Sequence, residues 1–230
     1  MKTATNEIAE RLATVRERIA NACARAHREV ASVRLVLASK TQPPDAIAAA
    51  HAAGARDFGE NYVQEAIAKR AALGHLTEAR WHLIGHLQSN KARTAVENFD
   101  LIHTLDSARL ANALARVRPS PPIPVLIEVN LGGEASKSGV PPDAVAPLLE
   151  SVRHAVVVRG LMTIPPPTEH PLDAHRWFVQ LRELRDRLAI ATGLALTELS
   201  MGMTEDYEAA IEEGATIVRV GRAVFGERLR

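Results

Sequence analysis

A lysine and an arginine stand out as residues that could do chemistry, because each lies at or near the end of a short β-rich run. Lys40 ends the run VRLVLASK, and Arg219 lies within TIVRVG. Side chains alternate between the two faces of a strand, so Lys40 is on the opposite face from Leu35 and Leu37, and Arg219 is on the opposite face from Val218. A cation on a buried strand face is costly unless a partner or a ligand neutralises it.

The elements that must position these residues alternate along the chain. Eight β-rich runs are separated by helical patterns, which predicts a single α/β domain over residues 1–230, a (β/α)8 TIM barrel. Helical spacing of apolar residues predicts an extra N-terminal helix over Thr5–Val30. An open doubly wound sheet stays an alternative, because periodicity does not show closure. The predicted strands are Arg34–Ser39, Asp57–Gly59, His82–Gly85, Leu101–Thr104, Val125–Asn130, Val156–Thr163, Glu198–Met201 and Ile217–Gly221. The helical patterns include Pro44–Ala53, Asn61–Leu73, Ser107–Val117, Pro142–Val152, His170–Thr192 and Thr204–Glu213.

The barrel assigns a direction to each strand face. All-aliphatic faces pack under the helices, so the polar faces point into the barrel. Lys40, Glu128 and Arg219 are then expected inside. Three inward charges suggest a shared ligand, although Glu128 and Arg219 could instead form a structural ion pair.

Two glycine-containing loops fall where barrels often bind phosphate, after the seventh and eighth strands. The first reads LSMGMTED and includes Ser200 and Gly202; the second reads VRVGRAVFG and includes Gly221 and Arg222. Backbone N–H groups of Gly221 and Arg222 could open a helix onto a phosphate. Burial beside an arginine favours the neutral lysine amine, the form that attacks an aldehyde. A lysine beside a phosphate site is the minimal set of groups for a pyridoxal 5′-phosphate Schiff base.

Composition excludes several other classes of partner. Net charge is +1, from 28 basic and 27 acidic side chains, and aromatics are 3%. We therefore expect no binding to nucleic acid or to an anionic membrane. A single cysteine, Cys23, permits no intrachain disulfide and is expected in the core. With no signal-peptide pattern at the N-terminus, a cytoplasmic location is expected by default.

Six stretches of the chain resemble the pyridoxal phosphate homeostasis protein family. They are LVLASKTQP, DFGENYVQEA, WHLIGHLQSNK, EVNLGGEASKSG, GLMTIPP and LSMGMTEDYEAAIEEGATIVRVGRAVFGER, and they span Leu35–Arg228. The resemblance implies a barrel like the N-terminal domain of alanine racemase, with the cofactor on Lys40. It also implies that Arg219 lies near the ring nitrogen and that Asn61 lies near the ring. The phosphate cradle that it implies consists of Ser200, Met201, Gly202, Gly221 and Arg222.

The chain departs from the family pattern at two places. Many relatives have Thr or Ser at the position of Arg222, so a backbone contact would survive there but a hydroxyl contact would not. Leu131 and Gly132 replace the Thr-Ser pair that is common in NTSGEESK.

Two functions remain. The first is a monomeric protein that holds and buffers pyridoxal 5′-phosphate, hands it to apoenzymes and has no robust catalysis. The alternative is an amino acid racemase that uses Lys40 as one base. A racemase needs a second acid/base on the opposite face of the substrate, and the related racemases take a tyrosine from a second domain of a partner subunit. The chain stops at Arg230, and its tyrosines are Tyr62 and Tyr207, so we favour the binding protein.

Other motifs are assigned structural roles. His82 and His86 lack the helix and the glutamate of a metalloprotease motif, so no metal site is expected. GEASKSG lacks the glycine that precedes the lysine of a nucleotide-binding loop, though an anion-binding turn stays open. Asn61 could simply cap a helix. Lys69 is expected at the surface.

Overall fold

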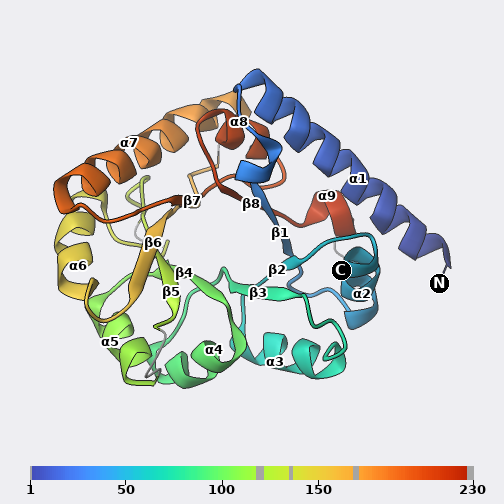
Figure 1. The fold of residues 1–230 in the computed structure, drawn as a ribbon, viewed down its shortest axis with the longest axis horizontal. Helices are drawn as coiled ribbons and strands as arrows, with labels where there is room; N and C mark the ends of the chain where they lie inside the picture. The colour runs from blue at the N-terminus through green and yellow to red at the C-terminus, as the bar shows by residue number, and fades with distance from the viewer. Residues whose placement is uncertain (1, 118–121, 135–136, 168–170, 227–230) are drawn as a thin grey trace.

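Eight parallel strands form a closed barrel in the computed structural model (Figure 1). Each strand pairs with its sequence neighbour, and β8 closes the barrel against β1. The structure describes residues 2–117, 122–134, 137–167 and 171–226. The predicted TIM barrel is confirmed, and the open-sheet alternative is wrong. The strands are β1 (Arg34–Ala38), β2 (Asp57–Glu60), β3 (Arg80–Leu83), β4 (Leu101–Leu105), β5 (Pro124–Glu128), β6 (Val157–Met162), β7 (Glu198–Ser200) and β8 (Ile217–Val220).

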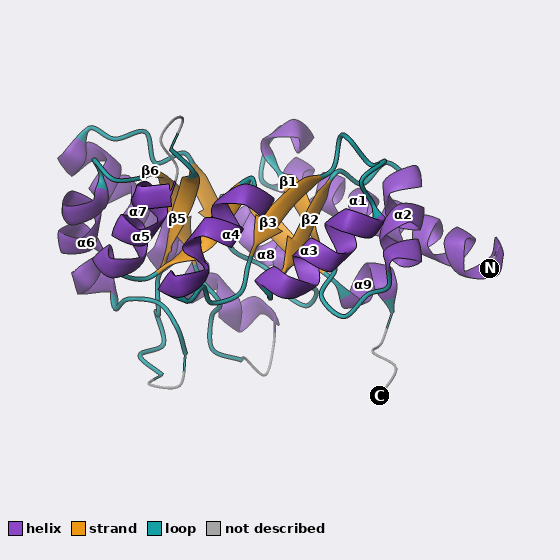
Figure 2. Cartoon of the chain, turned by 90° about the horizontal axis from the view of Figure 1, so that it is seen from below, coloured by secondary structure: helices purple, strands orange, loops and turns teal. Residues whose placement is uncertain are grey.

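Helices surround the barrel, and in Figure 2 the strands lie inside this ring while long loops leave one end of it. The α-helices are α1 (Lys2–Arg25), α2 (Pro44–Ala52), α3 (Val63–Ala72), α4 (Ala92–Asn98), α5 (Ala108–Val117), α6 (Val145–Val152), α7 (His175–Thr192), α8 (Tyr207–Glu212) and α9 (Arg222–Phe225). Short 3-10 turns are η1 (Val30–Ser32), η2 (Ser89–Lys91), η3 (Pro142–Ala144) and η4 (Pro171–Ala174). No helix in these described ranges is long and apolar enough to cross a membrane.

The predicted alternation of side chains in β1, β5 and β8 is confirmed by two separate apolar clusters. A small cluster fills the barrel interior, and the large core lies between the strands and the helices. The interior cluster is Val36, Leu101, Leu126, Met162 and Ile217. The large core includes Leu37, Val125, Ile127, Val129, Val218 and Val220. The polar residues of the three strands therefore share the interior face.

The extra N-terminal helix is confirmed, but it ends at Arg25 and not at Val30. His27 adopts a left-handed backbone, with φ 53°, and the N–H of Arg28 donates to the carbonyl of Cys23 at 2.8 Å. A left-handed residue just after the last turn is a common way to stop a helix. Cys23 is buried, as predicted.

Other boundaries differ from the prediction by a few residues. Strand β3 begins at Arg80, two residues earlier than predicted, which puts His82 inside the strand. The helix predicted over Thr204–Glu213 begins at Tyr207, because the side chain of Asp206 accepts from the N–H of Met203 and forms a turn first. The predicted Pro142–Val152 helix starts as the turn η3. The helix predicted from His170 begins at His175 after η4, and His170 itself lies outside the described residues. Helix α4 is not among the helical patterns that we list, and α9 begins at Arg222, where Gly221 and Arg222 were expected to open a helix.

Helix α1 covers the barrel beside α2, α8 and α9 (Figure 1). Leu12, Val15 and Ile19 bury one face of the helix. Arg18 and Arg25 also form ion pairs with side chains of α8. Exposed ion pairs contribute little, so burial of the apolar face is what attaches α1 to the barrel.

The substitution Leu12→Ala should therefore lower the free energy of unfolding by roughly 2–5 kcal/mol, because it leaves a cavity under α1. Denaturant unfolding followed by circular dichroism measures this change. The matched control is Ile190→Ala on α7, where the side chain is 86% exposed. Equal effects of the two substitutions would contradict the packing described for α1.

Candidate functional site

A cavity of about 680 Å³ opens where the strands end. Five of the predicted site residues line it, namely Lys40, Asn61, Arg219, Gly221 and Arg222. They come from the ends of β1, β2 and β8 and from the residues that follow them. Barrel active sites are built at this end, from loops that follow the strands. The closed barrel thus brings together residues that are up to 182 positions apart in the sequence, from Lys40 to Arg222.

Lys40 is held in place by the residues on either side of it. The hydroxyl of Ser39 donates to Glu60 Oε1 at 2.6 Å, and the N–H of Thr41 donates to Glu65 Oε1. Thr41 has a φ of 65°, in the left-handed region. A β-branched residue rarely adopts this conformation, and here the Glu65 contact holds it. The backbone that carries Lys40 is therefore fixed on both sides before any ligand binds.

The carboxylates of Glu60 and Glu65 both bond the ammonium group of Lys69. Lys69 is therefore not at the surface, where we expected it. Its side chain is buried, and Nζ donates to Glu60 at 2.8 Å, to Glu65 at 2.7 Å and to the carbonyl of Ser39 at 2.7 Å. We call Ser39, Glu60, Glu65 and Lys69 the Lys69 cluster. Burial raises the pKa of Glu60, and the hydrogen bonds from Lys69 and Ser39 offset part of that shift. The spacing of Glu65 and Lys69, four residues apart, was the signal in the sequence, but it did not show burial.

Arg219 lies at the floor of the cavity and is 4% exposed. Its Nη1 donates to Ser200 Oγ at 2.6 Å and its Nη2 to the carbonyl of Thr163 at 2.9 Å. Burial lowers the pKa of Arg219 to about 10, against the opposing effects of Asp206 and Glu128. The guanidinium therefore stays charged at neutral pH.

Ser200, Met201 and Gly202 are not among the residues that line the cavity. Ser200 faces the barrel interior, and Met201, the next residue, packs into the outer core. Gly202 has a φ of 91°, and a Cβ there would approach Ala210 Cβ to 2.6 Å. The predicted part of these three residues in a phosphate cradle stays a prediction. The loop reaches the cavity at Met203 and Thr204, which we had not singled out.

The loop after β8 lies close to β1. A Cβ on Gly221 would come within 3.1 Å of the carbonyl oxygen of Ala38. Helix α9 begins at Arg222, so its first N–H groups lie beside the cavity and have no partner within the helix. The Arg222 side chain turns to Glu205, at 2.9 Å.

Asn61 does not cap α3, so the capping alternative is wrong. Tyr62 occupies the N-cap position, without a side-chain hydrogen bond. Asn61 lines the cavity, and its buried Oδ1 has no hydrogen-bond partner among the described residues. Buried polar atoms are usually paired, so this oxygen is available to a polar ligand.

Gly132, which replaces the serine of the common family pattern, has a structural role. A Cβ at Gly132 would come within 2.4 Å of Pro166 Cγ. The Pro165–Pro167 loop, which lines the cavity, can therefore approach this turn because the residue is glycine. Leu131 packs against the large core.

Glu128 is buried inside the barrel and does not form the ion pair with Arg219 that we kept as an alternative. Among the described residues no salt bridge joins the two, and Glu128 Oε2 has no hydrogen-bond partner. Burial, together with the nearby Asp106, raises the pKa of Glu128 to about 7, although Arg219 acts in the opposite direction.

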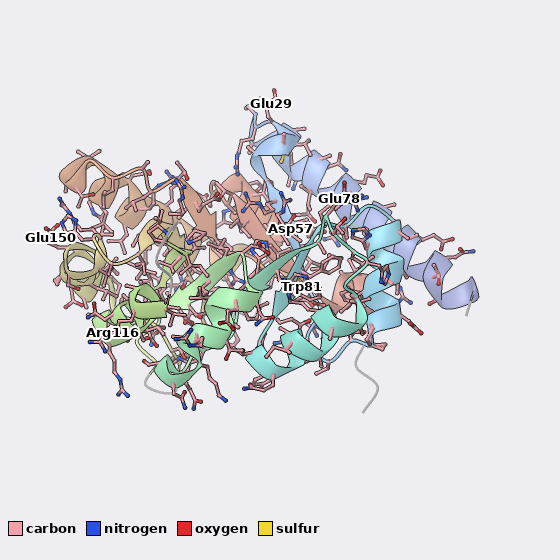
Figure 3. All side chains as sticks on the ribbon, turned by 60° about the horizontal axis from the view of Figure 1, so that its bottom comes forward. Glu29, Asp57, Glu78, Trp81, Arg116 and Glu150 are labelled. Atoms are coloured by element: carbon pink, nitrogen blue, oxygen red, sulfur yellow. The ribbon has the colours of Figure 1, made fainter. Side chains whose placement is uncertain are left out.

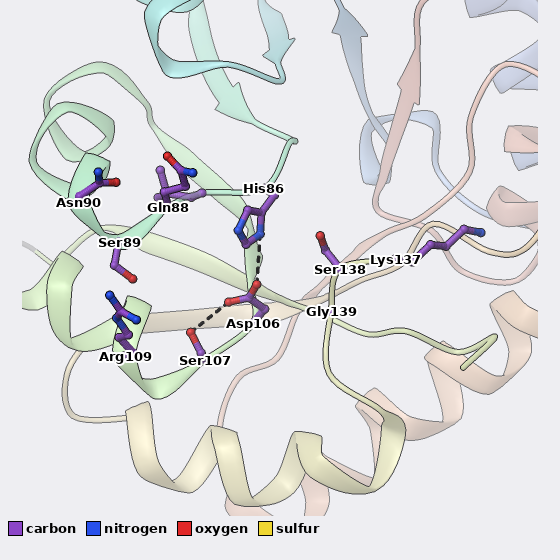
Figure 4. Close-up of a pocket in the computed structure, with 11 residues that line it drawn as sticks. His86, Gln88, Ser89, Asn90, Asp106, Ser107, Arg109, Lys137, Ser138 and Gly139 are labelled. Carbon is purple, nitrogen blue, oxygen red and sulfur yellow. Dashed lines mark hydrogen bonds and ion pairs between the residues drawn. The ribbon is translucent and has the colours of Figure 1, made fainter. Parts of the chain in front are cut away.

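A second cavity, of about 780 Å³, is lined mainly by polar residues (Figure 4). Lys137 lines both this cavity and the first one. His86 Nδ1 lies 3.2 Å from Asp106 Oδ2, and the Ser107 hydroxyl donates to Asp106 Oδ1 (Figure 4). Lys137 pairs with Glu134, while residues 135–136 of the GEASKSG motif lie outside the described residues. Within the described ranges, no group of three or more His, Cys, Asp or Glu side chains could hold a metal ion.

The raised pKa of Glu128 predicts a pH-dependent stability. A carboxyl with a higher pKa in the folded state binds its proton more tightly there, so it contributes stability at low pH that is lost as pH rises through about 7. Between pH 5 and pH 8 the unsubstituted protein should therefore lose roughly 2–3 kcal/mol of unfolding free energy through Glu128, and the Glu128→Gln variant should not. The unfolding free energy of the variant should rise by this amount relative to that of the unsubstituted protein.

Urea unfolding of the ligand-free protein at both pH values measures this gain. The control is Glu150→Gln on α6, an exposed position labelled in Figure 3, where no such change is expected. A gain that does not depend on pH would contradict the assignment.

Comparison with known proteins shows the family and the fold of the chain. The family model of the alanine racemase N-terminal domain matches residues 11–229. The pyridoxal phosphate homeostasis protein of Pseudomonas aeruginosa is 48% identical over 225 residues, which cover 96% of each chain.

Two solved structures are also similar. PipY of Synechococcus elongatus PCC7942, solved with PLP bound, is 42% identical with a TM-score of 0.85 and covers 95% of this chain and 100% of its own. Alanine racemase from Corynebacterium glutamicum has a TM-score of 0.73 at 18% identity, covering 97% of this chain and 62% of that one, and shares the fold. The chain belongs to the pyridoxal phosphate homeostasis protein family.

Proposed function

We propose that the protein holds pyridoxal 5′-phosphate as a Schiff base on Lys40, buffers it and supplies it to apoenzymes, with no robust catalysis of its own. The observation that carries the proposal is that Lys40 and the buried Arg219 face one cavity at the strand ends. The names of the relatives and the PLP-bound PipY structure support it.

The residues of the cavity fit this cofactor. A cavity of about 680 Å³ is within the range of small-molecule sites. Thr204, Gly221 and Arg222 offer hydroxyl, N–H and guanidinium donors at one side, as a phosphate requires. Asn61 brings an unpaired amide oxygen, which suits a polar substituent of the ring. The proposal keeps Ser200, Met201 and Gly202 in the phosphate cradle, beside Met203 and Thr204, which line the cavity.

Lys40 and Arg219 have different roles in the proposal. When bound, the cofactor would supply an aldehyde, and the Lys40 amine would hold it as a Schiff base with loss of one water. Arg219 keeps its proton, so it would donate to the ring nitrogen without protonating it. An unprotonated ring withdraws electrons weakly, which disfavours catalysis. The arrangement is therefore better suited to storage of the cofactor.

The racemase alternative lacks its second base among the tyrosines. Tyr62 is 63% exposed and Tyr207 is 1% exposed under the Arg18 guanidinium. Neither lines the cavity. Neither tyrosine of the chain is therefore placed to supply that second base at this cavity.

We further propose that the protein works as a monomer in the cytoplasm and binds neither nucleic acid nor membrane. The near-zero net charge of +1 supports the second part, because it provides no long-range attraction to polyanions.

Borohydride reduction tests the site of attachment. Reduction of the protein loaded with pyridoxal 5′-phosphate should place a stable pyridoxyl group on Lys40, found by peptide mapping. Lys91→Ala is the control and should leave the yield unchanged, because Lys91 does not line the cavity. A label on Lys91, or on Lys137 in the unsubstituted protein, would overturn the assignment, since Lys137 lines the same cavity.

Exchange with solvent tests the lack of catalysis. The loaded protein, incubated with L-alanine in deuterated water, should leave the Cα proton in place over many hours, as followed by proton NMR. Deuterium at Cα together with D-alanine, formed at about 1 s⁻¹ or faster, the lower range of enzyme turnover, would favour the racemase.

A further inference from the structure

A line of hydrogen bonds crosses the inside of the barrel, from Arg219 to Asp57. Arg219 Nη1 lies 2.6 Å from Ser200 Oγ, and Ser200 Oγ lies 2.8 Å from His103 Nδ1. His103 Nε2 lies 3.0 Å from His82 Nδ1, and His82 Nε2 lies 2.9 Å from Asp57 Oδ1. Five different strands, β8, β7, β4, β3 and β2, each contribute one residue. We call these five residues the barrel relay.

The middle of the relay is buried, and its two ends carry opposite charges. Ser200 and His103 are fully buried, and His82 is 2% exposed. At one end Arg219 faces the cofactor cavity. At the other end Asp57, the first residue of β2 (Figure 3), lines a separate cavity of about 250 Å³ and is bound by Arg80 at 2.6 Å.

The donors and acceptors follow from the two ends. The Arg219 guanidinium only donates, so Ser200 Oγ accepts from it and its own hydrogen is free to go to His103 Nδ1. His103 then carries its proton on Nε2 and donates to His82 Nδ1. His82 carries its proton on Nε2 and donates to the Asp57 carboxylate. Every proton in this assignment has an acceptor.

The charge states of the residues agree with this direction. Burial, aided by His82 and Arg219, lowers the pKa of His103 well below its usual range, so His103 is neutral. Burial opposes ionisation of Asp57, but the hydrogen bonds from His82 and Arg80 outweigh it and lower its pKa. The reverse direction needs a doubly protonated His82, a second cation inside the barrel. It also leaves the Ser200 hydroxyl hydrogen without an acceptor in the relay.

The relay affects the site because one of the two groups that bond Arg219, the Ser200 hydroxyl, belongs to the relay. The two close partners of Arg219 among the described residues are neutral oxygens, Ser200 Oγ and the Thr163 carbonyl. No salt bridge to Arg219 is found within the described ranges. Its orientation therefore depends on a hydroxyl, and the orientation of that hydroxyl depends on His103.

We infer that Ser200, His103, His82 and Asp57 are positioning residues, which fix the Arg219 guanidinium for the ring nitrogen of the cofactor from the opposite end of the barrel. The inference deepens the proposed function and rests on it. Hydrogen bonds in such a chain polarise one another, so a break far from Arg219 loosens Arg219 itself.

Nitrogen NMR of the imidazoles tests the direction of the relay in the unsubstituted, ligand-free protein. His82 and His103 should both show a protonated Nε2 and an unprotonated Nδ1. A proton on Nδ1 of either histidine would overturn the inference. This measurement needs neither a variant nor a bound cofactor, so it stands even if the proposed function fails.

His103→Asn tests whether the relay reaches Arg219. The asparagine oxygen can still accept from Ser200 near the former Nδ1 position, but the donor to His82 is lost, so the relay is cut between the two histidines. We expect the side-chain NMR signals of Arg219 to shift in the ligand-free variant. We also expect pyridoxal 5′-phosphate, followed by ultrafiltration, to leave about tenfold faster, with a displaced absorption band, as for loss of a supporting partner at a bound ion.

Thr104→Val is the matched control, because Thr104 is adjacent to His103, is 1% exposed and bonds the Gly85 carbonyl outside the relay. His82→Leu is a second cut, one residue further from Arg219, in case His103→Asn does not fold. The inference would be overturned if the relay-cut variant matched the Thr104→Val control in the Arg219 signals, in the rate of cofactor release and in the absorption band. If the unsubstituted protein traps no cofactor on Lys40, the proposed function fails, while the NMR of the ligand-free protein still decides the relay.

Discussion

The structure depends on a positive charge that must be kept inside a barrel. Arg219 is 4% exposed, so water does not solvate its guanidinium and the protein has to supply the partners. Two neutral oxygens, from Ser200 and Thr163, do so at close range. The hydroxyl of Ser200 is held in turn by a line of side chains that ends on an anion at the far end of the barrel.

Lys40, the other main residue of the site, is positioned by a different set of contacts. Lys40 follows a strand in a turn whose neighbours, Ser39 and Thr41, bond two carboxylates that share one buried ammonium, Lys69. A buried ion pair contributes little net stability against an apolar replacement, yet loss of one partner is costly. The Lys69 cluster therefore fixes the geometry of the turn more than it stabilises the fold. The acceptors in this cluster also explain why Lys69, which we expected at the surface, is buried beside the site.

In the proposed function, these two supports favour storage of the cofactor over turnover. A fixed lysine can hold an aldehyde, and a permanently charged arginine keeps a ring nitrogen unprotonated. Glu128, whose pKa is raised to about 7 by burial and Asp106, is the nearby group that changes charge near neutral pH. It has no direct bond to Arg219 and does not line the cavity.

The strands, to within two residues, and the inward faces of β1, β5 and β8 follow from the sequence, because a periodicity of two and an alternation of elements are local properties. The alternation favours a barrel, but it leaves closure of the sheet open. The sequence also determined Lys40 and Arg219 as residues to examine. The three-dimensional structure was needed to show that Thr204 lines the cavity and that His82 and His103 meet inside the barrel. The sequence indicates the face on which a side chain lies, but neighbours from other strands are set by the register and closure of the barrel.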